Sequence, residues 1–433
     1  MKPLVSSKSA CPGVRPAAVI ALSLVAAAAH AAAPTEQEVQ DLRARLEQSL
    51  QVIEQLNQRV KTLEKSAAAA PAASPAASPA EWGNAVVKRV DDLEKEVGAL
   101  SGVAGRQEGL PLHGFVDVGA LSTSQKGVAR KGAVVDGLDL YLTTQSGNVR
   151  ALTELNFEVD PEGGIGTDLE RIQLGYAFSD SLTLWAGRFH SPYGYWNTAY
   201  HHGAQIQPSI QRPRFLDFED KGGILPAHDI GLWATGKLPT AGHALHYDAW
   251  LANAPRIGAD GILDQNQAGA TNGHALLGAN LAMPFGGLTV GVHALNGRIG
   301  GPVDGQSVAD LRVFGGYAVY DDDNWEAMTE YFAFSDRNVS GGGSHASHAA
   351  YAHLGHTFGA WTPYARYELT SLDQADDYFA LMASGQSYRR ALAGLRYDID
   401  VNSTLKLEFD RTRLTDRIQE SYQESRVQYA FRF

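Results

Sequence analysis

The sequence has 433 residues, of which 44% are hydrophobic, and its formal net charge is -12. It contains no basic domain and no stripe of Lys and Arg, so we expect no binding to nucleic acid. The length suffices for two or more soluble domains or for one large barrel. Cys11 is the single cysteine, which excludes an internal disulfide framework.

The first segment has the pattern of an export signal. A basic stretch precedes an apolar stretch at 17–29, and Ala29-His30-Ala31 matches a small-residue cleavage site. We therefore expect residues 1–31 to be a cleaved Sec signal peptide. No later run reaches the roughly 18 apolar residues of a transmembrane helix, so an embedded chain would have to form a closed β-barrel.

An α-helical region is predicted next. Residues 34–65 carry apolar residues at alternating spacings of three and four, which predicts a periplasmic coiled coil, with a single amphipathic helix packed on a domain as the alternative. Residues 66–80 form a Pro/Ala/Ser linker, and residues 81–109 form a second short helical segment. The core positions leave the number of helices in the coiled coil open.

Period-two alternation begins at Leu112 and predicts an all-β transmembrane barrel over residues 110–433, with about 16 antiparallel strands of about ten residues each. A soluble sandwich would show the same alternation, but here tight turns and long loops follow one another in strict order, as in a barrel with both ends in the periplasm. The expected strands are 112–122, 136–144, 148–158, 168–179, 181–190, 227–238, 243–252, 273–283, 286–296, 309–320, 323–334, 347–358, 361–371, 387–398, 402–412 and 424–433.

The last expected strand alternates clearly. Val427, Tyr429 and Phe431 share one face, and Arg426 and Gln428 share the other. An outward apolar face with aromatic residues near its end fits the aromatic girdle of a membrane barrel. We expect this strand to close the barrel by pairing with the first strand near residues 113–119.

The longest connection, residues 191–226, is rich in aromatic residues and carries a compact set of charges. A loop of this length is usually functional, and its aromatic content indicates that it is packed. We expect it to fold into the lumen, where its charges would line a constriction; a flap on the barrel rim or a trimer contact is the alternative. The expected constriction residues are Arg188, Arg212, Arg214, Asp217, Glu219, Asp220 and Lys221.

Charged residues on the inward face of the later strands are expected to form the lumen wall and to bias the passage of ions. They include both signs and so do not specify a solute. These residues are Glu326, Glu330, Arg366, Glu368, Arg396, Lys406, Glu408, Asp410 and Arg426.

At the entry to the long loop, Leu182–Arg188 is followed by Pro192-Tyr193-Gly194. With the strand number and the long third loop, this stretch resembles the general trimeric outer-membrane porins and the phosphate-selective porins. The coiled coil before the barrel is similar to that of the sucrose porin and dicarboxylate-type channels. The resemblance implies a homotrimer with one pore per subunit. The loop has few lysines, so phosphate selectivity is not expected.

Three other motifs predict no site. Gly231–Lys237 begins like a phosphate-binding loop, but Leu238 replaces the required Ser or Thr. The acidic run 321–324 fits a tight turn. The histidines at 201 and 202, and those at 345, 348, 353 and 356, lack a metal-binding motif, so we expect no metal and no cofactor.

The sequence thus predicts a porin in the outer membrane of a Gram-negative cell, in contact with the lipid bilayer and lipopolysaccharide. It would pass small hydrophilic solutes or ions by diffusion, and no catalytic residues are expected. Two alternatives stay open. One is an envelope tether that reaches a periplasmic partner or peptidoglycan through residues 34–100. The other is a barrel-type hydrolase, whose residues would meet only in space.

Overall fold

The computed structural model describes residues 112–127, 132–159, 164–240, 242–264, 273–416 and 420–433. The expected signal peptide, coiled coil, linker and second helical segment lie outside these ranges. No helix within them is long and apolar enough to cross a bilayer.

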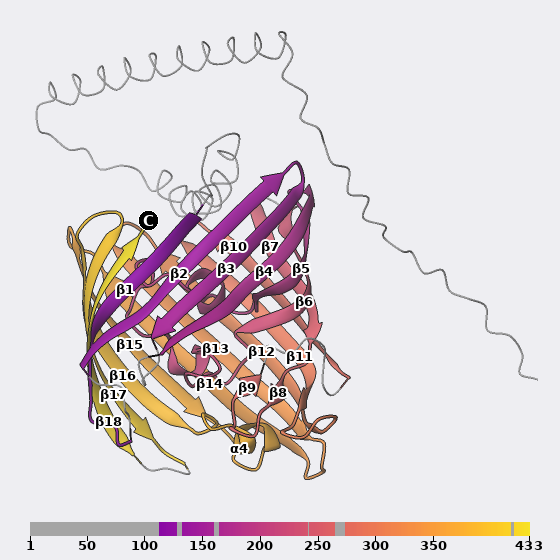
Figure 1. Ribbon diagram of the computed structural model, residues 1–433. Helices are drawn as coiled ribbons and strands as arrows, with labels where there is room; N and C mark the ends of the chain where they lie inside the picture. The colour runs from indigo at the N-terminus through magenta and orange to yellow at the C-terminus, as the bar shows by residue number, and fades with distance from the viewer. Residues whose placement is uncertain (1–111, 128–131, 160–163, 241, 265–272, 417–419) are drawn as a thin grey trace, which may run out of the picture. The chain divides into compact units, whose positions relative to one another are not determined.

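The described chain forms one antiparallel barrel (Figure 1). Its sheet has 18 strands, of which β8 (Arg256–Ile257) and β9 (Leu263–Asp264) are two residues long and belong to a loop. The other sixteen strands form the wall of the barrel, as the sequence predicts. They are β1 (Leu112–Thr123), β2 (Gly132–Ser146), β3 (Val149–Val159), β4 (Ile165–Ser179), β5 (Leu182–His190), β6 (His228–Thr240), β7 (His243–Asn253), β10 (Ala275–Phe285), β11 (Leu288–Gly300), β12 (Ser307–Asp321), β13 (Trp325–Asn338), β14 (Ser344–His356), β15 (Trp361–Ser371), β16 (Tyr388–Asp398), β17 (Ser403–Leu414) and β18 (Ser421–Arg432).

The barrel closes between its first and last strands. β1 pairs with β18 in antiparallel register from Phe115↔Arg432 to Thr123↔Glu424. The backbone N–H of Phe433 adds a hydrogen bond to the carbonyl of Gly114 at 3.0 Å. The predicted pairing is confirmed, and it extends further along β1 than residues 113–119. Closure leaves the sixteen described wall strands without an open edge between the first and the last.

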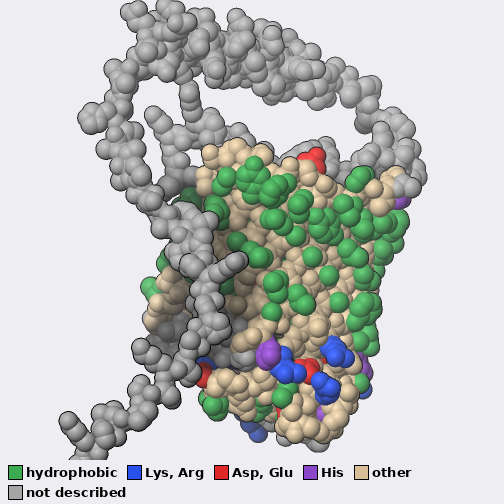
Figure 2. All heavy atoms as spheres, turned by 90° about the vertical axis from the view of Figure 1, so that its right-hand side faces the viewer, with side chains coloured by type: hydrophobic (Ala, Val, Ile, Leu, Met, Phe, Trp, Pro, Cys, Tyr) green, Lys and Arg blue, Asp and Glu red, His purple; other side chains and the backbone are tan. Residues whose placement is uncertain are grey.

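The two faces of the wall differ in polarity as predicted. In β17, Leu405 and Phe409 are 42% and 54% exposed on the outside, whereas the intervening Lys406 is fully buried inside. Figure 2 shows apolar side chains spread over the outer wall and charged ones gathered toward one end. An apolar outer band with a polar end suits a barrel surrounded by lipid.

Several strands extend beyond their predicted ends. β12 begins at Ser307, β13 continues to Asn338 and β14 begins at Ser344, all on the side of the long loops. The sequence pattern ends where lipid-facing hydrophobic residues end. The hydrogen-bond ladder continues into polar residues because backbone pairing does not need an apolar face.

One part of the barrel interior is apolar. Phe332 of β13 packs edge-on against Tyr193 and Phe215 of the long loop, with ring centroids 6.1 and 5.4 Å apart. The loop carries two short helices, α3 (Trp196–Ala199) and η1 (Arg214–Leu216). Buried wall residues that complete this core include Leu276, Leu295, Val313, Tyr317 and Tyr351.

Candidate functional site: the loop inside the barrel

Residues 191–226 leave the wall after β5 and return at β6. The two ends meet, since the N–H of Ser191 donates to the carbonyl of Ala227 at 2.9 Å. The Asn197 side-chain amide donates to the carbonyls of both residues, at 2.7 and 3.3 Å. This neck fixes where the loop enters the barrel.

Glu330 of β13 provides the first anchor on the opposite wall. Its buried carboxylate accepts the backbone N–H groups of Tyr195 and Trp196, at 2.8 and 2.7 Å. It also accepts the hydroxyl of Tyr351 at 2.7 Å. Gly194 has φ +65°, and a Cβ there would collide with this carboxylate. The Pro192-Tyr193-Gly194 stretch therefore allows the loop to approach Glu330 closely.

Arg366 of β15 provides the second anchor and is buried. Its guanidinium donates to Ser209 Oγ at 2.6 Å and to the carbonyls of Gln211 and Arg212 at 2.8 and 2.9 Å. It pairs with Glu368 at 2.8 Å, and Glu368 in turn accepts the backbone N–H of Arg214 at 2.8 Å. Hydrogen bonds to charged groups are among the stronger ones, and this pair makes several.

The third anchor lies on β17. Lys406 Nζ donates to the carbonyls of Ala204 and Gln207, at 2.5 and 2.7 Å. Glu408 accepts the N–H of Ile210 at 2.9 Å, and Asp410 accepts the Gln211 amide at 2.9 Å. The loop thus crosses the interior from the β5–β6 neck to β13, β15 and β17, so the rim-flap alternative is not what the structure has.

Four of the expected constriction residues lie within the anchored loop. Arg212 is buried within the loop and braces it by donating to the carbonyls of Leu216 and His201, at 3.0 and 2.5 Å. Glu219 accepts the N–H of Ala227 at 2.7 Å. Arg214 is half-buried and reaches the hydroxyl of Tyr422. Asp217 is also half-buried, and burial raises the pKa of its carboxyl.

The other three contact neighbouring strands or solvent. Asp220 and Lys221 are exposed, and Lys221 pairs with Glu158 at 2.5 Å. Arg188 of β5 is buried and donates to the carbonyl of Glu170 at 2.9 Å. The structure therefore divides the expected set into braces, half-buried charges and exposed charges, and does not bring it together as one ring.

Three expected wall residues are not among the anchors described above, although one of them also reaches the loop. Arg396 pairs with Asp398 at 2.8 Å and also donates to the carbonyl of Gln207. Arg426 pairs with its own neighbour Glu424 at 3.2 Å. Glu326 is half-buried, 3.6 Å from His353.

Comparison with known proteins rests on the barrel. No family model and no curated protein matches the sequence. Among solved structures, an anion-selective porin from Comamonas acidovorans is 15% identical over 74% of this chain and 98% of its own, with a TM-score of 0.53. The chain has the porin barrel fold.

Two further structures agree. OmpT, an outer membrane protein of Vibrio cholerae, is 10% identical over 74% of this chain and 96% of its own, with a TM-score of 0.51. A Salmonella typhi OmpF complex with daunomycin is 13% identical over 74% and 97%, also with a TM-score of 0.51. These similarities establish the porin fold. The identity of the solute has to be inferred from the residues of this chain.

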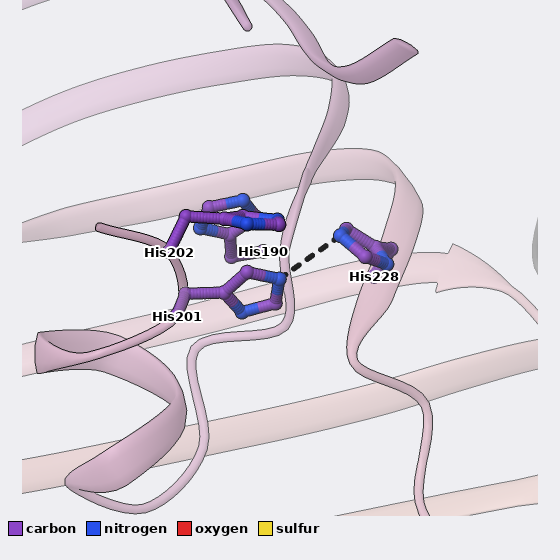
Figure 3. A group of neighbouring side chains, drawn as sticks. All are labelled: His190, His201, His202 and His228. Atoms are coloured by element: carbon purple, nitrogen blue, oxygen red, sulfur yellow. Dashed lines mark hydrogen bonds between the residues drawn. The ribbon is translucent and has the colours of Figure 1, made fainter. Parts of the chain in front are cut away.

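Sequence reasoning missed two groups of residues inside this porin fold. Arg390 is buried and bonds Asp410 at 3.1 Å, next to the exposed Arg389. Strand parity could have assigned Arg390 to the interior. The second group is a histidine cluster at the neck, which brings His190 and His228 of the wall to the His201-His202 pair of the loop (Figure 3). Its sequence signals are the adjacent pair His201-His202, for which the sequence pattern predicts no metal, and the two wall histidines that flank the loop.

Proposed function

We propose that the protein is an outer-membrane channel that passes small hydrophilic solutes or ions by diffusion, through a lumen narrowed by residues 191–226. The observation that carries this proposal is the anchoring of the loop across the interior of a closed barrel by Glu330, Arg366 and Lys406. A loop held by buried charges keeps a fixed shape, and a fixed shape gives a pore a defined width.

Half-buried charges on the inward faces would line the remaining path. Arg171, Arg396 and Arg426 have side chains that are 21%, 17% and 26% exposed, and Glu158 and Glu326 are 34% and 26% exposed. Both signs are present, which favours hydrated polar solutes over apolar ones. The channel role requires no catalytic residue and no cofactor.

Single-channel recording tests the proposal. The folded chain, reconstituted into planar bilayers, is expected to give discrete conductance steps that scale with salt concentration. Folded protein that inserts but gives no conductance would contradict the channel. Adding panels of sugars, dicarboxylates and phosphate would identify the solute by the fall in ion current.

We further propose a homotrimer. A groove of about 540 Å³ on the outer wall supports this assembly, because it is lined mainly by apolar residues from five adjacent strands, β17, β18, β1, β2 and β3. Its lining includes Val118, Val135, Val427 and Tyr429. The mass of the detergent-solubilised protein, measured by light scattering, is expected to be three times that of one chain. Substituting Val427→Arg should lower it.

Contact with lipopolysaccharide is also proposed. Arg389 and Arg413 are exposed and face each other directly across β16 and β17, near the long-loop end, with Arg411 beside them. Like charges in directly opposed positions repel, so the phosphates of lipid A would relieve this repulsion. A contact of residues 34–100 with a periplasmic partner or peptidoglycan stays a prediction, outside the described residues.

A further inference from the structure

Four histidines meet at the neck of the loop (Figure 3). His190 is the last residue of β5 and His228 the first of β6, and they are directly paired in the sheet. His201 and His202 reach them from the loop. One ring nitrogen from each of the four lies within 4.8 Å of the others.

The ring nitrogens face one another and two carboxylates. His201 Nε2 and His228 Nε2 are 2.9 Å apart. Glu170 Oε2 lies 2.5 Å from His228 Nε2 and 3.5 Å from His202 Nε2. Glu154 Oε2 lies 3.3 Å from His190 Nε2. Around a tetrahedral metal with bonds of about 2.0–2.1 Å, neighbouring ligand atoms are separated by about 3.3 Å. The His201–His228 spacing of 2.9 Å is close to this value, whereas the 2.5 Å contact of Glu170 with His228 is a hydrogen-bond distance that would have to open around an ion.

The far sides of three rings face oxygen atoms, Asn197 within hydrogen-bond distance and two carboxylates slightly beyond it. His201 Nδ1 is 2.9 Å from Asn197 Oδ1, His202 Nδ1 is 3.4 Å from Asp139 and His228 Nδ1 is 3.6 Å from Glu219. A proton on His201 Nδ1, donated to Asn197, leaves the His201 Nε2 lone pair free for a ligand. His228 Nε2, which contacts the Glu170 carboxylate, would release its proton on binding an ion, as metal-ligating groups do. This arrangement of outer carboxylates or amides is typical of metal-binding histidines.

The site is built in a buried place. His201, His228 and Glu154 are 4%, 3% and 0% exposed. The Nε2 atoms of His190 and His202 are buried and have carboxylates at 3.3 and 3.5 Å, but within the described residues they make no hydrogen bond of good geometry. Buried polar atoms of this kind normally have partners, and an ion shared among them would provide one.

We propose that His190, His201, His202 and His228 bind one divalent transition-metal ion of the zinc class, with Glu170 at the edge of the site. Imidazole ligands favour zinc, nickel or copper, whereas calcium and magnesium prefer oxygen ligands. Two ligands come from the wall and two from the loop. The ion would therefore fasten the neck of the loop to the barrel, whether or not the barrel conducts.

The test uses untagged full-length protein, folded in detergent and stripped with a chelator. Titration with Zn²⁺ in a calorimeter is expected to give one ion per chain. Co²⁺ should produce the visible absorption of a low-symmetry nitrogen site, and Zn²⁺ should remove it. The double variant H201Q/H228Q is expected to lose more than about 100-fold in affinity, since outer-shell changes alone cost about 10–100-fold.

His353→Gln is the matched control, because His353 is buried inside the barrel away from the cluster, near Glu326. It should bind Zn²⁺ as the unsubstituted protein does. Asn197→Ala removes an outer acceptor and should weaken binding about 10–100-fold while keeping one ion per chain. This variant keeps the test decisive if the double variant does not fold.

Two results would overturn the site. One is the absence of stoichiometric Zn²⁺ binding by the unsubstituted protein, which would leave the cluster as proton-sharing ion pairs. The other is an affinity for Zn²⁺ that is the same in H201Q/H228Q as in the His353→Gln control. If the double variant does not fold, Asn197→Ala is compared with the control instead.

Discussion

At the scale of single residues, the buried charges of the wall act as clamps for backbone groups of the loop. Glu330, Arg366 and Lys406 each bond two or more loop atoms. A buried charge is costly unless hydrogen bonds satisfy it, and here the loop supplies those bonds. The loop and the charged wall therefore depend on each other.

Removing one clamp tests this dependence. Glu330→Gln keeps the shape of the side chain but removes the charge of the carboxylate, which accepts the N–H groups of Tyr195 and Trp196. We expect folding to be weakened by about 1–3 kcal/mol, the range for lost hydrogen bonds to charged or buried groups. The temperature at which the folded band disappears on a gel should fall. Asp220→Asn, an exposed loop carboxyl, should leave it unchanged; equal effects would contradict the clamp.

Arg212 and Arg214 are expected to behave differently although they are near neighbours. Arg214 is half-buried and directs its charge at Tyr422, so Arg214→Gln should shift the reversal potential in a salt gradient toward cations. Arg212 is committed to loop carbonyls, so Arg212→Gln should destabilise the loop and make the current noisier. Unchanged reversal potentials in Arg214→Gln would show that this residue lies outside the path.

At the scale of elements, the loop resembles a small core inserted in the barrel. Phe215 packs on β13 and Trp196 packs on β14. A second loop covers the far end of residues 191–226, where Tyr378 of α4 (Asp377–Leu381) donates to the carbonyl of Ile224 at 2.7 Å. Aromatic packing and charged clamps thus act on the same segment.

Disrupting the aromatic packing separates the two contributions. Phe215→Ala removes a fully buried ring that contacts Phe332 and Tyr351. Large-to-small changes of this kind cost about 3–5 kcal/mol. The folded barrel should melt earlier, and proteases should cut inside residues 191–226 first. Phe409→Ala, on the outer face, is the control; cleavage at the same rate in both variants would contradict an internal core.

The sequence predicts the wall strands well because lipid and lumen impose a strict alternation of apolar and polar side chains on each strand. Leu405 and Lys406 illustrate it, with one side chain outside and the next inside. It cannot tell which inward charges hold the loop, since Arg366 and Arg212 meet only after closure of the barrel. The same reason hides the histidine cluster, in which the pairing of β5 with β6 joins His190 to His228 and the folded loop adds His201 and His202.

At the scale of the whole molecule, the face of the barrel shown in Figure 2 has an apolar wall and a charged end. The exposed pair Arg389 and Arg413 lies at the long-loop ends of β16 and β17. The R389Q/R413Q variant should lose retention of lipopolysaccharide through purification, measured as bound phosphate. Arg150→Gln, an exposed arginine at a tight turn, should not; equal losses would contradict a lipid A site.

The central claim is that residues 191–226, inserted into the closed barrel, set the width of a channel. The most direct measurement is the single-channel conductance of the protein beside a variant in which residues 204–211 are replaced by a short glycine linker. This segment holds much of the contact with Arg366 and Lys406. A several-fold larger conductance step in the variant is the expected result. Equal steps from both folded proteins would contradict the account.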